Sequence, residues 1–333
     1  QPVRPFDVDT EVSPGEKRQF RFRISETYLG DPVELPITVI NGDRDGPRVF
    51  MVAALHGDEL NGVKVLQEVG ARYDPSDVQG TLVLLHVANV PGFQAQTRYL
   101  PIYDRDINRS FPGNERSNTA ERMAHQIYTR FISQCDLGLD FHTSTRNRTT
   151  MFHIRADLHR PEVEELATAF GTNVILSGEG DEGTLRTVAT RNGIPTITVE
   201  MGKAHRFQPG LIEQALSGVE SVLTTYDVYP SGTVAEPAWR KVMWGPNPLV
   251  HEGEPICVLS DHFKREEHLV EAPLTGLIVG ALENPVALPG HPICHLVRIT
   301  PETHEEIDRE IRKGEFDGYR SYGQRWMADE EAA

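Results

Sequence analysis

The feature that most constrains the fold of this chain is an alternation of short apolar runs with amphipathic segments over about the first 230 of its 333 residues. The runs are rich in Val, Ile and Leu, are bounded by Gly, Pro, Asn or Asp, and read "PITVI", "RVFMVAAL", "TLVLLHVA", "DLGLDFHT", "NVILSG" and "PTITVEMG". Such runs are typical of strands that are covered on both faces. We therefore expect an α/β domain with a mostly parallel mixed sheet flanked by helices, in which the loops at the carboxyl ends of the strands carry the chemistry.

Three of the intervening segments have clear helical signatures. The segment 119–134 places its apolar residues on one face at the helical period, and Asn118 with Glu121 supplies a capping box. The segment 161–170 begins with a proline and stops before a glycine, and a third helix is expected from about residue 209 to 226. Helices that alternate with strands favour a parallel sheet.

The pattern changes after about residue 230, where the helical period disappears. "PICVL", "HLVEAPLTGLIVGAL", "PVALPG" and "PICHLVRI" read as short strands separated by Gly and Pro. We expect a large α/β domain over 1–229, a small all-β domain over 230–303, and a charged C-terminal extension over 304–333. The extension is expected to form a surface helix followed by an acidic tail.

Composition excludes several classes of function. The formal net charge of −16 argues against nucleic acid or an anionic membrane as a partner, and the chain has no apolar run of the roughly 20 residues that span a bilayer. The N-terminal segment lacks the apolar core of a secretory signal, although a signal removed before Gln1 stays open. Cys135, Cys257 and Cys294 are too few and too scattered for a disulfide framework, which favours the cytoplasm. A homo-oligomer is also left open.

Metal-capable side chains follow two of the expected strands. His56 and Glu59, in "LHGDELNG", are three residues apart, so a turn beginning there directs both at one point. His142, in "LGLDFHTS", ends another apolar run in the same positional role. Three protein ligands of these types leave a fourth position for water, which predicts one catalytic zinc per chain. The alternative is a helix-start turn in which Asp58 or Glu59 caps the helix and His56 is incidental.

A hydrolytic zinc site also needs a base for the attacking water. Glu200 is a lone acidic residue that closes the strand "PTITVEMG", where burial and a nearby metal would tune its proton affinity. The alternative is a carboxylate that solvates a strand end. We favour the catalytic role because the other strong strands of this half also end in candidate ligands.

Cationic residues gather in the loop "TRYLPIYDRDINRSFPG", against the acidic background of the chain. Arg109 with Asn108 can hold a carboxylate by a guanidinium fork and an amide, and Arg98 can polarise a scissile carbonyl. The alternative is an exposed loop with salt bridges through its two aspartates, and we expect this alternative to hold for Arg105.

Four motifs, "HGDE", "DINRSFPG", "DFHT" and "ITVEMG", occur in this order and resemble the succinylglutamate desuccinylase/aspartoacylase family, a branch of the zinc carboxypeptidase fold. The resemblance covers about residues 35–300 and implies a small all-β domain that closes over the active site. For the site, the resemblance implies that zinc is held by His56, Glu59 and His142 and that Glu200 is the general base. It implies that Asn108 and Arg109 bind a carboxylate and that Arg98 polarises the carbonyl. It also implies a further substrate-binding arginine, Arg186, in "EGTLRTVATRNGIPTITVE".

These residues favour a zinc-dependent amidohydrolase that removes an acyl group from an N-acylated amino acid or a related small metabolite. One alternative keeps the chemistry but acts on peptides, as a zinc carboxypeptidase, although the β domain would crowd a long chain. A second alternative is a catalytically silent sensor of an acidic metabolite. Glu200 counts against the sensor, which has no need of a base.

Overall fold

The computed structural model describes residues 7–27, 29–101, 104–145, 148–172, 174–234, 249–260, 267–282 and 292–312. The chain divides into two compact units, one formed by residues 1–146 and 152–238 and the other by 147–151 and 239–333. The two units are described separately below. The division into 1–229, 230–303 and 304–333, and the role of the second region as a lid, stay predictions.

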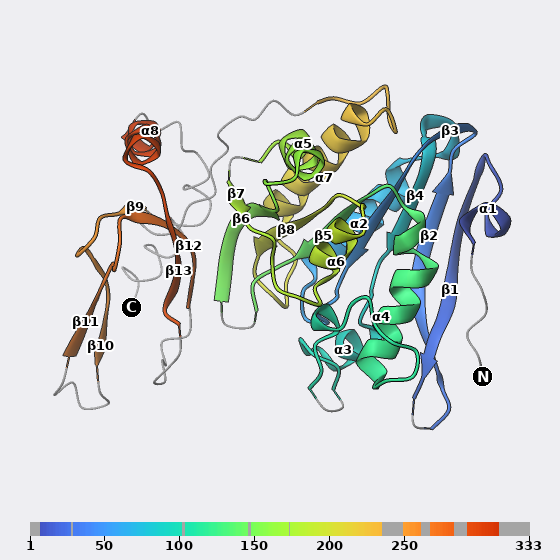
Figure 1. The fold of residues 1–333 in the computed structure, drawn as a ribbon, viewed down its shortest axis with the longest axis horizontal. Helices are drawn as coiled ribbons and strands as arrows, with labels where there is room; N and C mark the ends of the chain where they lie inside the picture. The colour runs from blue at the N-terminus through green and yellow to red at the C-terminus, as the bar shows by residue number, and fades with distance from the viewer. Residues whose placement is uncertain are drawn as a thin grey trace. The chain divides into compact units, whose positions relative to one another are not determined.

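The first unit is built on a mixed sheet (Figure 1). Its strands lie in the order β1 (Glu16–Glu26), β2 (Pro32–Asn41), β4 (Gln79–Leu85), β3 (Arg44–Ala53), β5 (Leu137–His142), β8 (Thr196–Gly202) and β6 (Arg148–Ala156), with β7 (Ile175–Ser177) beside β6. The pairs β3–β4, β3–β5, β5–β8 and β6–β7 are parallel, whereas β1–β2 and β2–β4 are antiparallel. The predicted fold class, a mostly parallel mixed sheet flanked by helices, is confirmed.

Helices cover both faces of this sheet. On one face α4 (Thr119–Arg130) packs against β1, and a buried cluster joins it to α1 (Val8–Glu11), α6 (Leu185–Arg191) and the inward side chains Phe50 and Val52 of β3. On the other face lie α2 (Asn61–Arg72), α5 (Pro161–Phe170) and α7 (Pro209–Thr225), which pack on one another and on β3 and β8. Because β3 is covered on both sides, Val49 and Met51 are also fully buried. Such two-sided burial explains the near-continuous apolar run of this strand.

The helices predicted from the sequence are found with small changes. Asn118 caps α4 by accepting a hydrogen bond from the backbone N–H of Glu121. The helix ends at Arg130, and a separate 3₁₀ turn, Ile132–Gln134, replaces the predicted last turn. Helix α5 has the predicted bounds, and α7 ends one residue earlier than expected. Shorter elements complete this unit: α3 (Val90–Ala95) and the 3₁₀ turns Pro75–Asp77 and Ile107–Arg109.

The second unit is mostly β structure. Strands β10 (Pro255–Ser260) and β11 (Glu267–Glu271) form an antiparallel pair, and β12 (Gly276–Leu282) pairs with β13 (Cys294–Arg298), with β9 (Leu249–Val250) and with residues 148–150 at the start of β6. A charged helix, α8 (Pro301–Arg312), follows. The predicted strand "PVALPG" and the predicted acidic tail lie outside the described residues. No helix in the described part of the chain is both long and apolar enough to cross a membrane.

Candidate metal and catalytic site

The candidate site forms at the carboxyl ends of three neighbouring parallel strands of the first unit. His56 and Glu59 lie in the turn after β3, and His142 is the last residue of β5. Glu200 lies near the end of β8, directly opposite His142 in the strand register. Because carboxyl ends of parallel strands meet at one edge of the sheet, residues far apart in the sequence converge there.

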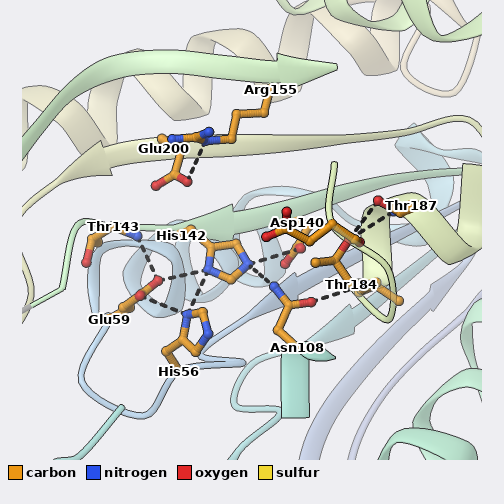
Figure 2. Close-up of polar contacts among 12 residues, drawn as sticks. His56, Glu59, Asn108, Asp140, His142, Thr143, Arg155, Thr184, Thr187 and Glu200 are labelled. Carbon is orange, nitrogen blue, oxygen red and sulfur yellow. Dashed lines mark hydrogen bonds and ion pairs between the residues drawn. The ribbon is translucent and has the colours of Figure 1, made fainter. Parts of the chain in front are cut away.

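His56, Glu59 and His142, called here the ligand cluster, point toward one another (Figure 2). Nδ1 of His56 is 2.9 Å from Oε1 of Glu59, Nδ1 of His142 is 2.9 Å from Oε2, and the two Nδ1 atoms are 3.2 Å apart. The three side chains are at most 6% exposed. Two imidazole nitrogens and a carboxylate oxygen within 4.8 Å of one another fit the donor set of a metal ion with an open position.

In each imidazole of the cluster, the ring nitrogen that points away from the other two residues contacts a carboxylate. Nε2 of His56 is 3.2 Å from Oδ1 of Asp106, and Nε2 of His142 is 3.0 Å from Oδ2 of Asp140. Carboxylates in this position fix the ring orientation and direct the other nitrogen at the metal, which supports the metal assignment.

Sequence reasoning missed both of these carboxylates. Asp140 and His142 are two residues apart on one strand, so they share a face of the sheet, and this spacing was a usable signal. The expectation that Arg105 forms a salt bridge with Asp104 or Asp106 is wrong, because Arg105 forms no ion pair within the described residues. Asp106 instead contacts His56 and accepts a hydrogen bond from the backbone N–H of Asn108.

The charges of the cluster stabilise one another. Burial raises the pKa of Glu59, but His56 and His142 outweigh burial and hold this pKa well below its usual range. Burial lowers the pKa of His142, but Asp140 and Glu59 outweigh it and raise this pKa well above its usual value. Glu59 also accepts hydrogen bonds from Nη1 of Arg98 at 2.7 Å and from the backbone N–H of Thr143 at 2.9 Å.

Close packing positions the turn that carries the first two members of the cluster. A Cβ atom on Gly57 would lie 2.0 Å from the backbone of Gly92, so only glycine fits at this position between His56 and Asp58. The fully buried Asn61 ties the turn to the end of β8 and to the segment after it, because its amide donates to the carbonyl of Met201 and its oxygen accepts from the backbone N–H of Gln208. This link joins the metal-ligand turn to the strand that bears Glu200.

Glu200 has a cationic partner that the sequence did not reveal. Nε of Arg155, on β6, donates to Oε1 of Glu200 at 3.1 Å (Figure 2). Since β8 lies between β5 and β6 in the sheet, Glu200 has His142 on one neighbouring strand and Arg155 on the other.

The side chains of the predicted carboxylate clamp, Asn108 and Arg109, already have partners within the chain. Nδ2 of Asn108 is 3.4 Å from Nε2 of His142, and its Oδ1 accepts from the backbone N–H of Leu185. Arg109 uses one terminal nitrogen for the carbonyl of Asn108 and the other for Oδ2 of Asp181, each at 2.8 Å. The Asn108 and Arg109 side chains therefore do not form a joint fork here.

Arg186 lies on α6 and is only 7% exposed. Its Nη1 donates to the carbonyl of Gly178 at 2.9 Å. Burial lowers the pKa of Arg186, and the positive charge of Arg155 lowers it further. The charges of the Arg155 and Arg186 guanidinium groups therefore interact with each other.

Comparison with known proteins identifies the part of the chain that carries these residues. Residues 45–226, more than half of the chain, match the family described as "Succinylglutamate desuccinylase/Aspartoacylase catalytic domain". N-alpha-acetyl-L-2,4-diaminobutyric acid deacetylase from Halomonas elongata is 28% identical over 201 residues, which are 58% of this chain and 58% of that protein. A probable aspartoacylase from Parasynechococcus marenigrum is 26% identical over 105 residues, 29% of this chain and 34% of that protein. The chain thus matches less than two thirds of the length of either relative.

Solved structures share the fold over most of the chain. A succinylglutamate desuccinylase from Silicibacter sp. TM1040 gives a TM-score of 0.77 at 21% identity, covering 89% of this chain and 98% of that chain. The product-bound ectoine utilization protein EutE (DoeB) from Ruegeria pomeroyi gives 0.76 at 21% identity, with coverage of 89% and 98%. These likenesses establish the architecture, whereas the chemistry must be argued from the site.

Proposed function

The chain belongs to the succinylglutamate desuccinylase/aspartoacylase family, and we propose that it is a zinc-dependent amidohydrolase. It would remove an acyl group from an N-acylated amino acid or a related small metabolite. The observation that carries this proposal is the ligand cluster, backed by Asp106 and Asp140 and adjoined by Glu200. The members of the family named above are deacylases, which agrees with such a site.

His56, Glu59 and His142 would hold one zinc ion per chain. Two nitrogen donors and one oxygen donor suit zinc, and three protein ligands are typical of its catalytic sites. When bound, zinc lowers the pKa of a water molecule toward about 7 and polarises a carbonyl oxygen.

Glu200 is proposed as the general base and acid. It accepts a proton from the water whose oxygen attacks the acyl carbon, and it returns that proton to the nitrogen as the amide C–N bond breaks. The products are a carboxylic acid and a free amine. Arg98 would donate to the carbonyl oxygen as negative charge develops there. Its contact with Glu59 and the packing of its guanidinium 5.6 Å from the ring centre of Tyr99 would hold it in place.

Asn108, Arg109 and Arg186 are proposed to recognise polar groups of the substrate. Asn108 lies beside His142, so its amide is close to the reacting groups. Arg109 would have to release Asp181 before it binds a polar group of the substrate, which its exposed side chain allows. For Arg186 the support is a buried guanidinium that makes its single hydrogen bond within the described residues to Gly178.

Similarity to the Halomonas elongata deacetylase supports an acetyl group on a small amino acid as the first substrate to test. The three unpaired cysteines support a reducing compartment such as the cytoplasm. We further propose that the β region after residue 230 acts as a lid and that the chain can form a homo-oligomer.

Metal analysis combined with a substrate panel tests the proposed function. The zinc-loaded protein is assayed for amine release from N-acetyl, N-succinyl and N-formyl amino acids, including Nα-acetyl-L-2,4-diaminobutyrate, with dipeptides as controls. We expect about one zinc per chain, hydrolysis of at least one N-acyl amino acid, and loss of both in His142→Ala. Unchanged zinc stoichiometry in that variant would contradict the ligand assignment. Cleavage of dipeptides alone would indicate a carboxypeptidase, and no hydrolysis at all would indicate a sensor.

A further inference from the structure

We propose that Arg155 is the residue that binds the α-carboxylate of the substrate's amino acid, beside the base and on the side away from the ligand cluster. The inference rests on the proposed function, because it takes Glu200 as the group that protonates the leaving amine. It adds a specificity-determining residue that sequence reasoning did not identify.

The position of Arg155 follows from the order of the strands. Glu200 on β8 lies between β5, which ends in His142, and β6, which bears Arg155. A substrate whose acyl carbon lies at the ligand cluster and whose nitrogen lies at Glu200 therefore extends toward β6. The carboxyl carbon of an amino acid is two bonds, about 2.5 Å, from its nitrogen. The α-carboxylate thus falls next to Glu200, within reach of the guanidinium that contacts Glu200.

The hydrogen bonds of Arg155 leave the right donors available. Its Nε is used by Glu200, and its two terminal nitrogens make no hydrogen bond to any residue in the described part of the chain. Its side chain is 38% exposed. These two terminal N–H groups form the planar fork that matches a carboxylate. Arg109, by contrast, already uses both of its terminal nitrogens.

Electrostatics gives a second reason for a cation at this position. A substrate carboxylate beside the Glu200 carboxylate would meet a like charge, in a protein whose net charge is −16. Arg155 lies between the two anions and can bind both at once, through Nε and through its terminal fork. Charge repulsion is thereby replaced by two charge-assisted contacts.

Arg186 adds a second positive charge near Arg155. Its Nη1 binds the carbonyl of Gly178, and the N–H of Gly178 binds the carbonyl of Ala156, the residue after Arg155. The buried guanidinium of Arg186 is therefore anchored at the same end of β6. Two neighbouring cations with donors to spare favour a bound anion.

The test compares each N-acyl amino acid that the panel shows to be hydrolysed with its α-carboxamide. In wild type we expect the acid to be preferred in kcat/KM by about 10- to 100-fold, the worth of charge-assisted hydrogen bonds. In Arg155→Gln this preference should fall to near one. Arg155→Lys should recover only part of it, because a point charge cannot reproduce the fork.

Arg160→Gln is the matched control. Arg160 has the same type of contact, Nε to a carboxylate oxygen of Asp157 at 3.2 Å, and a side chain that is 39% exposed. This variant loses an equivalent ion pair but should keep the wild-type preference for the acid. An equal loss of acid and amide hydrolysis in Arg155→Gln, with the preference retained, would show that Arg155 acts only on Glu200 and would overturn the proposal. A wild-type preference near one would overturn it as well.

Calorimetric binding of the same acids and carboxamides separates this inference from the proposed function. If the protein hydrolyses nothing on the panel but binds the acids, and Arg155→Gln abolishes this binding, the anion site is supported and the amidohydrolase is refuted. If the protein hydrolyses the acids and Arg155→Gln changes neither their binding nor the preference for them, the amidohydrolase is supported and the anion site is refuted. Unchanged thermal unfolding and zinc content would show that the variant is folded.

Discussion

The side chains of His56, Glu59 and His142 are at most 6% exposed, whereas those of Arg109 and Arg155 are 44% and 38% exposed. Both ring nitrogens of each histidine in the ligand cluster have partners within the chain. The arginines instead rest on carboxylates that a substrate can replace or share. We infer that this site combines a preorganised part, the ligand cluster, with a more exposed rim formed by Arg109 and Arg155.

Glu200 lies where these two parts meet, and its replacement should have the largest effect. We expect Glu200→Gln to retain zinc and fold but to lose at least ~100-fold in kcat, the usual worth of a positioned general base. Steady-state hydrolysis together with zinc analysis measures this. Near-normal turnover would make Glu200 a bystander, and loss of zinc would place it within the preorganised part.

Arg98 binds Glu59, and in the proposed mechanism it would also donate to the carbonyl oxygen of the substrate. We expect Arg98→Gln to lower kcat by about 100-fold with a smaller change in KM, since its bond to the carbonyl oxygen strengthens only in the transition state. Zinc content measured on the same sample distinguishes this role from support of Glu59. If KM rises and kcat does not change, Arg98 binds the ground state only.

Asp140 tests whether the preorganised part depends on its carboxylates. Asp140→Asn keeps the size of the side chain but removes the charge that faces Nε2 of His142. We expect a loss of about 10- to 100-fold in zinc affinity. Competition with a chromogenic chelator measures the affinity. Asp157→Asn is a suitable control, because it removes a buried carboxylate that pairs with Arg160 outside the ligand cluster. Equal zinc affinity in the two variants would contradict the assigned role of Asp140.

Substitution of Arg109, in the rim, should change the kinetics less than the substitutions above. We expect Arg109→Gln to raise KM by less than about 10-fold and to leave kcat nearly unchanged, because an exposed guanidinium paired with Asp181 contributes little net free energy. Arg109→Lys should not restore the wild-type KM if the fork matters. A fall in kcat comparable to that of Glu200→Gln would show that Arg109 belongs with the reacting groups.

Much of the fold and the centre of the site could be predicted from local patterns. The apolar runs that became β3, β4, β5 and β8 were identifiable because strands buried on both faces have near-continuous apolar sequences. Apolar runs also marked β2 and β7, although β7 is short and partly exposed. Strands β1 and β6 were not predicted. Their sequences, "EKRQFRFRISE" and "RTTMFHIRA", mix charged and polar residues with apolar ones, so they lack such a run.

Local sequence patterns place His56, Glu59, His142 and Glu200 at the ends of buried strands, and the spacing of Asp140 and His142 on one strand also predicts that these two share a face of the sheet. Two other partners follow only from the tertiary structure. Asp106 faces His56 because of the geometry of its loop, and Arg155 faces Glu200 because of the sheet order β5–β8–β6, in which neighbouring strands are far apart along the chain. Periodicity records which face of its own element a residue occupies, but which elements become neighbours depends on how all of them pack together.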